Sequence, residues 1–325
     1  MHILITGAAG MIGRKLTARL VKDGKLNGKP ISRLTLIDVV APEKPAGFSG
    51  TVEASTSDLS AAGAVEKAIA DRPEMIFHLA GVVSGEAETD FDKGYRVNLD
   101  GARALLEAIR PANYKPKVVF TSSIAVFGAP FPTSIPDEFQ LTPLTSYGTQ
   151  KAICELLLAD YNRRGFLDGV GIRLPTICVR PGKPNKAASG FFSGIIREPL
   201  AGQEALLPVA ESVRHTHASP RAAVGFLIHA AGLTREQLGP RINLAMPGVS
   251  CTVGEQIDAL RRVAGDKVAT RIRRQPDELV QRIVSGWAER IDARRARELG
   301  FKAETAFDDI VRAHIEDELG GKIAS

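Results

Sequence analysis

The chain has 325 residues, of which 44% are hydrophobic and 24% are charged, and its formal net charge is +5. This composition excludes a disordered chain, and no run approaches the ~18 consecutive apolar residues that a membrane helix needs. The cysteines Cys154, Cys178 and Cys251 are too few and too widely spaced for a disulfide framework or a CxxC zinc site.

Short apolar runs alternate with segments of helical spacing through the first half of the chain. The expected strands are residues 2–6, 34–40, 75–80, 117–121 and 170–174, with another short strand before Asp58. The expected helices are residues 11–21, 61–70, 95–109 and 149–161. Continuously apolar strands that alternate with helices indicate a parallel sheet covered on both faces. The predicted fold class is therefore α/β, with a Rossmann-type doubly wound parallel sheet.

The pattern becomes irregular after residue 174. Residues 175–208 are rich in Gly, Pro and Lys, and an apolar helix over 220–231 and a strand over 242–245 follow. Helical charge patterns then cover residues 253–264, 276–289 and 304–318. We predict a Rossmann domain over residues 1–174, to which 214–245 returns, and a smaller, mainly helical domain built from 175–213 and 246–325.

A glycine-rich turn lies between the first strand and the first helix. Gly7 permits a tight turn, Gly10 lets the backbone approach a pyrophosphate, and Gly13 allows close packing of helix on strand. The helix start at Met11 and Ile12 offers unpaired N–H groups to phosphates. Because the strand–turn–helix context is the one that this motif requires, we predict a dinucleotide site rather than a purely structural turn.

The carboxyl ends of the later strands supply the rest of the predicted cofactor site. Asp38 ends the second strand, where an acid can bind ribose hydroxyls and repel a 2′-phosphate, which selects NAD over NADP. The alternative for Asp38 is an exposed loop aspartate, and His78 is expected to be a core histidine. Further cofactor contacts are expected at the same edge, from Asp58, Leu59, Leu79, Ala80 and Gly81.

A serine, a tyrosine and a lysine have the spacing of a catalytic group. Ser123 follows the fifth strand, and Tyr147 and Lys151 are four apart, on one face of a helix. A lysine ammonium beside a phenol favours the phenolate, so Tyr147 can act as a general base while Ser123 orients the reacting hydroxyl. The alternative is an ordinary Tyr–Lys contact on a helix face.

Several motifs together resemble the extended short-chain dehydrogenase/reductases, the NAD-dependent epimerase/dehydratase family. Residues 6–13 resemble its TGxxGxxG turn, 120–128 its SSxxVYG strand end, 143–151 its PxSxYxxSK helix start, and 297–301 its C-terminal LGF segment. The resemblance covers nearly the whole chain. It implies an NAD-binding Rossmann domain, a substrate-binding domain and a catalytic triad of Ser123, Tyr147 and Lys151, with Lys151 also holding the nicotinamide ribose. It further implies that Asn98, a structural asparagine of the family, and Pro175 belong to the cofactor-binding residues.

Departures from the family pattern narrow the expected activity. Ile124 and Ala125 stand where dehydratases carry an acid pair, so dehydration is not expected. Decarboxylating relatives carry a glutamate at the position of Ala125, so decarboxylation is not expected either. Thr176 replaces an asparagine that contacts the nucleotide sugar in epimerases, and Pro220 and Arg221 stand where aspartates are usual. These changes argue against a nucleotide-sugar substrate.

The remaining basic residues suit a smaller anion. Arg180, Arg214 and either His215 or His217 are candidate partners for a carboxylate. Within the family, the TxxxGxxGRKL opening, the length and the segment 180–182 most resemble a group that oxidises the C2 hydroxyl of a four-carbon sugar acid with NAD. The alternatives are a nucleoside-diphosphate-sugar epimerase with tightly bound NAD, and a non-catalytic dinucleotide sensor. The predicted substrate contacts are Ser123, Thr176, Arg180 and Arg214.

The expected partners follow from the same motifs and from the charge pattern. The substrate is a small anionic sugar, and neither nucleic acid nor a membrane is expected, because the basic stretch 261–274 fits a solvated face. A metal is not expected either, since His215 and His217 lack further ligands nearby. Family analogy predicts a homodimer through residues 98–109 and 149–161. With no export signal at the N-terminus, we expect a cytoplasmic protein.

Overall fold

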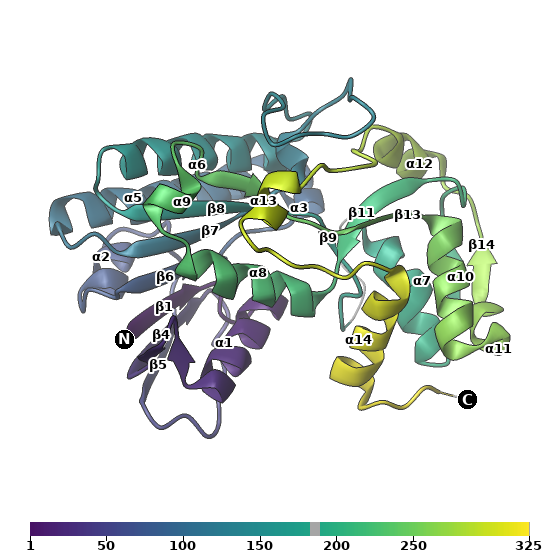
Figure 1. The fold of residues 1–325 in the computed structure, drawn as a ribbon, viewed down its shortest axis with the longest axis horizontal. Coiled ribbons are helices and arrows are strands. Elements are labelled where there is room, and N and C mark those ends of the chain that lie inside the picture. The colour runs from purple at the N-terminus through teal and green to yellow at the C-terminus, as the bar shows by residue number, and fades with distance from the viewer. Residues whose placement is uncertain (183–188, 325) are drawn as a thin grey trace. The chain divides into compact units, whose positions relative to one another are not determined.

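A computed structural model describes residues 1–182 and 189–324, and the chain divides into two compact units (Figure 1). Unit 1 consists of Met1–Val126, Pro143–Leu174 and Val224–Leu244. Unit 2 consists of Phe127–Thr142, Pro175–Ala223 and Ala245–Ser325. No helix in the described part of the chain has the length and apolar character needed to cross a membrane.

Unit 1 is built on a seven-stranded sheet with the order β12-β8-β7-β6-β1-β4-β5. Neighbouring pairs from β8 to β5 are all parallel, so their carboxyl ends meet at one edge. The predicted α/β fold with a Rossmann-type sheet is confirmed. The strands are β1 (His2–Thr6), β4 (Arg33–Asp38), β5 (Thr51–Thr56), β6 (Met75–His78), β7 (Lys117–Ser123), β8 (Asp168–Leu174) and β12 (Asn243–Ala245).

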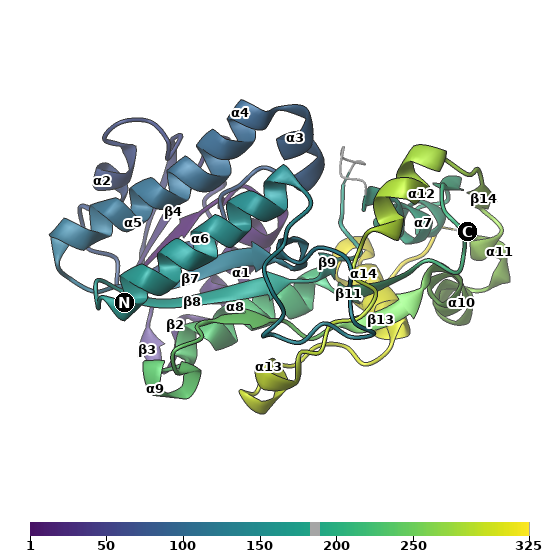
Figure 2. The ribbon, with the colours of Figure 1, turned by 90° about the horizontal axis from the view of Figure 1, so that it is seen from above.

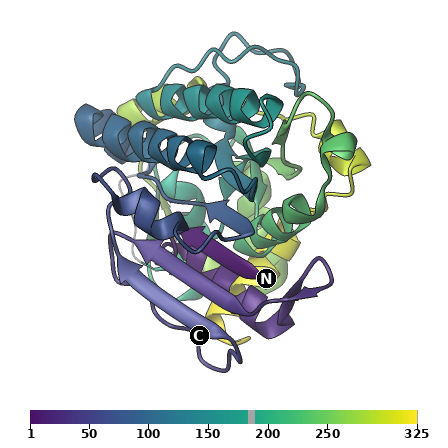
Figure 3. The same ribbon diagram turned by 90° about the vertical axis from the view of Figure 1, so that its left-hand side faces the viewer.

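Helices pack on both faces of this sheet. Figures 1 and 2 show α5 (Gly101–Ala112) and α6 (Ser146–Arg163) side by side over one face, and Figure 3 shows α1 (Met11–Asp23) against the other. Helix α1 buries Leu16 and Leu20, which are four residues apart, and therefore presents one apolar stripe to the strands. The other elements are β2 (Lys25–Leu26), β3 (Lys29–Pro30), α2 (Ala64–Ile69), α3 (Ser84–Thr89), α4 (Phe91–Gly94), η1 (Tyr95–Asp100), η2 (Ile124–Val126), α8 (Pro220–Gly232) and α9 (Arg235–Leu238).

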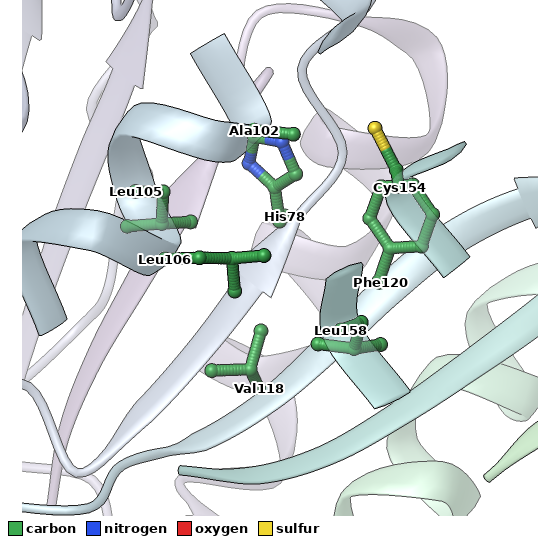
Figure 4. A pocket seen from close by; sticks show the side chains of 8 residues that line it. All are labelled: His78, Ala102, Leu105, Leu106, Val118, Phe120, Cys154 and Leu158. Carbon is green, nitrogen blue, oxygen red and sulfur yellow. The ribbon is translucent and has the colours of Figure 1, made fainter. Parts of the chain in front are cut away.

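The core of unit 1 lies between the central strands and these helices. Consecutive residues such as Ile76 and Phe77 are both fully buried, because each face of the sheet is covered. A cavity of about 10 Å³ remains beneath α5 and α6, lined mainly by apolar side chains that include Phe120 and Leu158 (Figure 4). It has room for about one water, so it is a packing void rather than a ligand site.

Unit 2 combines helices with two small sheets. The strand orders are β13-β11-β9 and β10-β14, and α10 packs against α7, α11 and α14. The strands are β9 (Thr176–Ile177), β10 (Ala205–Leu207), β11 (Arg214–Ala218), β13 (Val249–Thr252) and β14 (Ile272–Arg274). The helices are α7 (Gly190–Leu200), α10 (Val253–Ala264), α11 (Asp266–Ala269), α12 (Glu278–Ser285), α13 (Arg294–Glu298) and α14 (Phe307–Leu319).

The division of the chain differs from the predicted boundaries in two places. Residues 214–223 were expected to return to the Rossmann domain, but β11 pairs with β9 and β13 and belongs to unit 2. The return begins only at Val224. Residues 127–142 also belong to unit 2, where Ile135 bridges Ile291 and Asp137 accepts a hydrogen bond from the Ala245 amide. Both differences arise from pairings between distant segments.

Candidate cofactor and catalytic site

The glycine turn of unit 1 has two glycines that its own packing requires. Gly7 has a φ of +73°, and a Cβ there would lie 2.6 Å from the Ala80 nitrogen. A Cβ on Gly13 would collide with the Gly7 carbonyl oxygen. Gly10 is exposed, and the nearest atom to its Cβ position is 3.2 Å away. The chain therefore makes a tight turn with a bare outer face, which a diphosphate can approach closely.

Helix α1 begins at this bare face. Gly10 is its extended N-cap residue, and the first turn contains no acidic side chain. The first amides of a helix lack intrahelical acceptors and carry partial positive charge. The backbone at Met11 and Ile12 thus presents donors at the position predicted for phosphates.

Two aspartates follow neighbouring strands at the same edge. Asp38 Oδ2 accepts a hydrogen bond from the Ala9 amide at 2.9 Å, so its carboxylate is held beside the glycine turn rather than in a separate loop. Asp58 Oδ1 accepts from the Ser60 hydroxyl at 2.6 Å and the Ser60 amide at 2.9 Å. These hydrogen bonds lower the pKa of Asp58. Leu59, beside it, is buried.

The end of β6 meets β1 and α6. The Leu79 amide donates to the Thr6 carbonyl at 3.1 Å, which brings residues 79–81 beside the glycine turn. A Cβ on Gly81 would lie 2.9 Å from Asn98 Oδ1 and 3.6 Å from Lys151 Nζ. The structure therefore brings Gly81 together with two other predicted site residues.

Asn98 is almost completely buried in the π-helical segment η1. Its Oδ1 accepts from the Val82 amide at 2.8 Å, and its Nδ2 donates to Gln150 Oε1 at 2.7 Å. These bonds connect the loop after β6 to α6, which is a structural role. A cofactor contact by Asn98 stays a prediction.

His78 is a core histidine, as predicted. It is 3% exposed, and its Nδ1 lies 2.8 Å from the Thr6 hydroxyl. Burial lowers its pKa to about 3, so the ring is neutral at physiological pH. Figure 4 shows His78 among apolar side chains from α5, α6 and β7.

Helix α6 begins with two caps that place Tyr147. The Thr145 hydroxyl accepts from the Gly148 amide at 3.0 Å, and Glu88 accepts from the Ser146 amide. A Cβ on Gly148 would collide with the Ala125 carbonyl oxygen, so the helix lies directly on the backbone that follows Ser123. This glycine therefore permits Tyr147 and the end of β7 to come close together.

Lys151 is fixed between β7 and Tyr147. It is 4% exposed, and its Nζ donates to the Thr121 carbonyl at 2.9 Å. Nζ also lies 5.8 Å from the centre of the Tyr147 ring. Ser123 Oγ accepts from the Ala125 amide at 3.1 Å. The structure thus combines an ammonium group, a phenol and a hydroxyl at one edge of the sheet.

A buried ion pair beside this group was not predicted from the sequence. Ser122 Oγ donates to Glu155 at 2.5 Å, and Arg173 of β8 pairs with the same carboxylate at 2.8 Å. A sequence signal was available, since a glutamate on the buried face of a helix needs a partner. The partner itself, 18 positions later in the chain, could not be identified from local spacing.

Thr176 is the first of the predicted substrate-binding residues in unit 2. Its Oγ1 lies 2.8 Å from His215 Nε2, and His215 Nδ1 lies 2.9 Å from the Ala288 carbonyl. Because a carbonyl only accepts, Nδ1 carries the proton and the Thr176 hydroxyl donates to Nε2. Burial lowers the pKa of His215 to about 4, which keeps this arrangement at neutral pH.

The two candidate arginines of unit 2 differ in their surroundings. Arg180 donates from Nε to the Ile177 carbonyl at 3.1 Å and from Nη2 to Ser189 Oγ at 3.1 Å. Arg214 donates to the Ser250 carbonyl and forms an ion pair with Glu255 at 3.2 Å. Glu255 therefore offsets the charge that was predicted to meet an anion.

A metal centre is absent from the described residues, among which no group of three His, Cys, Asp or Glu side chains could hold an ion. His217 contacts Gln256 through its Nε2 at 2.8 Å, and burial keeps its pKa well below 6.5. The histidine pair of β11 is therefore part of the interior of unit 2.

Most of the chain matches a known protein family. The sequence profile described as the NAD dependent epimerase/dehydratase family matches residues 3–216. The chain belongs to this family. The predictions of an NAD-dependent oxidoreductase and of membership in this family are confirmed, and use of NAD(H) follows from both.

Individual relatives match this chain over nearly its whole length. D-erythronate dehydrogenase of Cupriavidus necator is 50% identical, with 98% of both chains covered. D-erythronate dehydrogenase of Haemophilus influenzae is 41% identical, with 98% of this chain and 100% of the relative covered. A crystal structure described as a nucleoside-diphosphate-sugar epimerase from Agrobacterium tumefaciens is 69% identical, with a TM-score of 0.98, and covers 100% of this chain and 96% of that one.

Proposed function

We propose that this enzyme oxidises a secondary hydroxyl of a small sugar acid, at C2 of a D-erythronate-like substrate, to the 2-oxo acid with NAD. One observation carries the substrate class. Two dehydrogenases of this specificity match over nearly their full lengths, so the similarity includes unit 2 as well as the Rossmann sheet. The Ser123, Tyr147 and Lys151 group supports the reaction type.

The proposed NAD site uses the edge of the unit 1 sheet. The bare glycine turn and the start of α1 would hold the diphosphate, and Asp38 would accept hydrogen bonds from the adenosine ribose. A carboxylate held by the Ala9 amide would also repel a 2′-phosphate, which favours NAD over NADP. When bound, NAD supplies the hydride acceptor. The other proposed contacts are Asp58, Leu59, Leu79, Ala80, Gly81, Asn98 and Pro175.

The chain supplies the proton chemistry. Tyr147 takes the proton of the substrate hydroxyl, and the Lys151 ammonium stabilises the phenolate that receives it. Lys151 is well placed because the Thr121 carbonyl fixes its Nζ. Ser123 Oγ accepts from the Ala125 amide, and its own O–H would donate to the reacting oxygen. Ile124 and Ala125 provide no acid for elimination.

The substrate carboxylate is proposed to meet unit 2. Arg180 is one candidate, and its Nε and Nη2 are oriented by the Ile177 carbonyl and the Ser189 hydroxyl. Arg214 is the other, and Glu255 offsets part of its charge. Thr176 is proposed to face the sugar hydroxyls. Its hydroxyl proton is engaged by His215, so Thr176 offers an acceptor rather than a donor.

We also propose that the enzyme is a homodimer through residues 98–109 and 149–161. Leu156 of α6 is 65% exposed, which supports an apolar contact on this helix. Size-exclusion chromatography with light scattering tests the proposal, and a monomer would contradict it.

A nucleoside-diphosphate-sugar epimerase is the second candidate, supported by the description of the 69% identical structure. Such an enzyme returns the hydride to its product, whereas a dehydrogenase releases reduced cofactor. Purified protein is therefore mixed with NAD and a panel of four- to six-carbon sugar acids, with UDP-sugars in parallel. Net NADH with a tetronate supports the proposed function, and an isomerised UDP-sugar without net NADH supports the epimerase.

A further inference from the structure

A buried polar network lies behind the proposed catalytic group. Ser122 Oγ donates to Glu155 Oε1 at 2.5 Å, and Arg173 donates to both Glu155 oxygens at distances between 2.8 and 3.2 Å. The three residues are 3%, 0% and 6% exposed, respectively. Charge-assisted bonds in such a dry environment are strong and directional, so the network holds its three members rigidly.

The network joins the elements that carry the reacting groups. Ser122 belongs to β7, Glu155 to α6 and Arg173 to β8. The Glu155 carbonyl also accepts from Asn243 Nδ2 at 3.3 Å, which adds the edge strand β12. One helical turn of α6 is therefore attached to three neighbouring strands.

Its position determines where the reacting groups point. Ser122 immediately precedes Ser123, and side chains of a strand alternate between faces, so fixing one serine orients the other. Glu155 lies four residues after Lys151 and eight after Tyr147, which places all three on one face of α6. The contacts of Glu155 with the sheet restrain the helix that carries Tyr147.

Stability alone is a poor explanation for this ion pair. Buried ion pairs are commonly replaceable by apolar side chains without loss of stability, because desolvation offsets their attraction. A directional network is better suited to fixing the position of α6 relative to β7 and β8. We propose that Ser122, Glu155 and Arg173 are positioning residues that set the separation between the Ser123 hydroxyl and the Tyr147 phenol. The inference rests on the proposed function, because it assigns a task to that pair.

Ser122→Ala is the most selective test, because it removes the bond from β7 to Glu155 while leaving the Glu155–Arg173 pair intact. Small misplacements of reacting groups are costly, so we expect kcat with D-erythronate to fall roughly 10- to 100-fold. KM and NAD affinity should stay near the wild-type values, because no proposed contact is removed. Ser122→Thr retains the hydroxyl and should recover most of the lost kcat.

A matched control is available at the other end of α6. Asn162 is 5% exposed, and its Oδ1 accepts from the Gly169 amide at 2.9 Å, so it also joins α6 to β8. Asn162→Ala should lower thermal stability but leave kcat unchanged. A loss of kcat that simply follows thermal stability in both variants would overturn the positioning role.

Two outcomes separate this inference from the proposed function. Wild-type protein that turns over a sugar acid, together with Ser122→Ala of equal kcat, overturns the positioning role alone. Wild-type protein without such turnover contradicts the proposed function. In that case amide exchange of the NAD-bound protein still decides the inference. Faster exchange at residues 121–123 and 146–151 in Ser122→Ala, but not in Asn162→Ala, supports it, and unchanged exchange overturns it.

Discussion

At the junction of β7 and α6 in unit 1, Glu155 is buried as an anion against Arg173, whereas in unit 2 His215 and His217 are buried as neutral rings. Both centres stand beside residues proposed to act on the substrate. The first pairs two opposite charges with each other. The second depends on histidines that stay unprotonated. Buried polar groups therefore hold α6 in position on the strands in one unit and set the direction of a hydrogen bond in the other.

The largest effect is expected at the catalytic centre itself. Tyr147→Phe removes the proposed base but preserves the ring, so kcat should fall about 10³- to 10⁴-fold. NAD binding, measured by titration of intrinsic fluorescence, should persist because the glycine turn is unchanged. Turnover equal to that of the wild type would exclude the Ser-Tyr-Lys mechanism.

The charged network predicts the next largest effect, this time on stability. Glu155→Gln removes the carboxylate that pairs with the buried Arg173 guanidinium, which should lower the free energy of unfolding by roughly 3–5 kcal/mol. Urea denaturation measures the change. Asp160→Asn is the matched control, because it breaks the exposed pair of Asp160 with Arg163 on the same helix and should cost about 1 kcal/mol or less. Equal losses would show that burial of the pair does not matter.

The two candidate arginines of unit 2, Arg180 and Arg214, provide a sharper contrast. Arg180→Met removes a proposed charge-assisted bond to the carboxylate, typically worth ~1.5–3 kcal/mol, and should raise KM roughly 10- to 100-fold. Arg214→Met should change KM much less, because Glu255 already pairs with that guanidinium. Steady-state kinetics of both variants tests the ranking. A reversed order would make Arg214 the carboxylate partner.

The neutral histidines predict acid sensitivity. The pKa of His215 is about 4 in the folded protein, below its ordinary value of 6.5, so the unfolded chain binds the proton more tightly. This stability is complete above pH 6.5 and is lost as the pH falls towards 4. His78 acts in the same direction, with its loss extending to about pH 3. His215→Phe should make unfolding less dependent on pH between 6.5 and 4, and an identical slope would contradict this account.

The sequence predicted the parts of the fold that local patterns encode. The central strands of the large sheet are buried on both faces and are therefore visible as apolar runs, whereas the edge strand β5 is largely exposed. The turn around Gly7 has a steric requirement that only glycine meets. The spacing of Tyr147 and Lys151 likewise placed both on one helix face. The catalytic assignment of these residues remains a prediction.

What the sequence did not reveal depends on contacts between distant segments. Strand β11 contains Arg214, His215 and His217, so it lacks an apolar run, and its pairing with β9 and β13 could not be seen locally. The ion pair between Arg214 and Glu255 joins residues 41 positions apart in the numbering. The helix expected over 276–289 is shorter, Glu278–Ser285, because Asp277 caps its start and Gly286 ends it.

The proposed reaction transfers hydride from C2 of a sugar acid to NAD. It is tested most directly with D-erythronate that carries deuterium at C2, incubated with the purified enzyme and NAD. We expect one deuterium in each reduced cofactor and a slower rate than with unlabelled substrate. Unlabelled NADH would place the oxidation at another carbon, and the absence of net NADH would contradict a dehydrogenase.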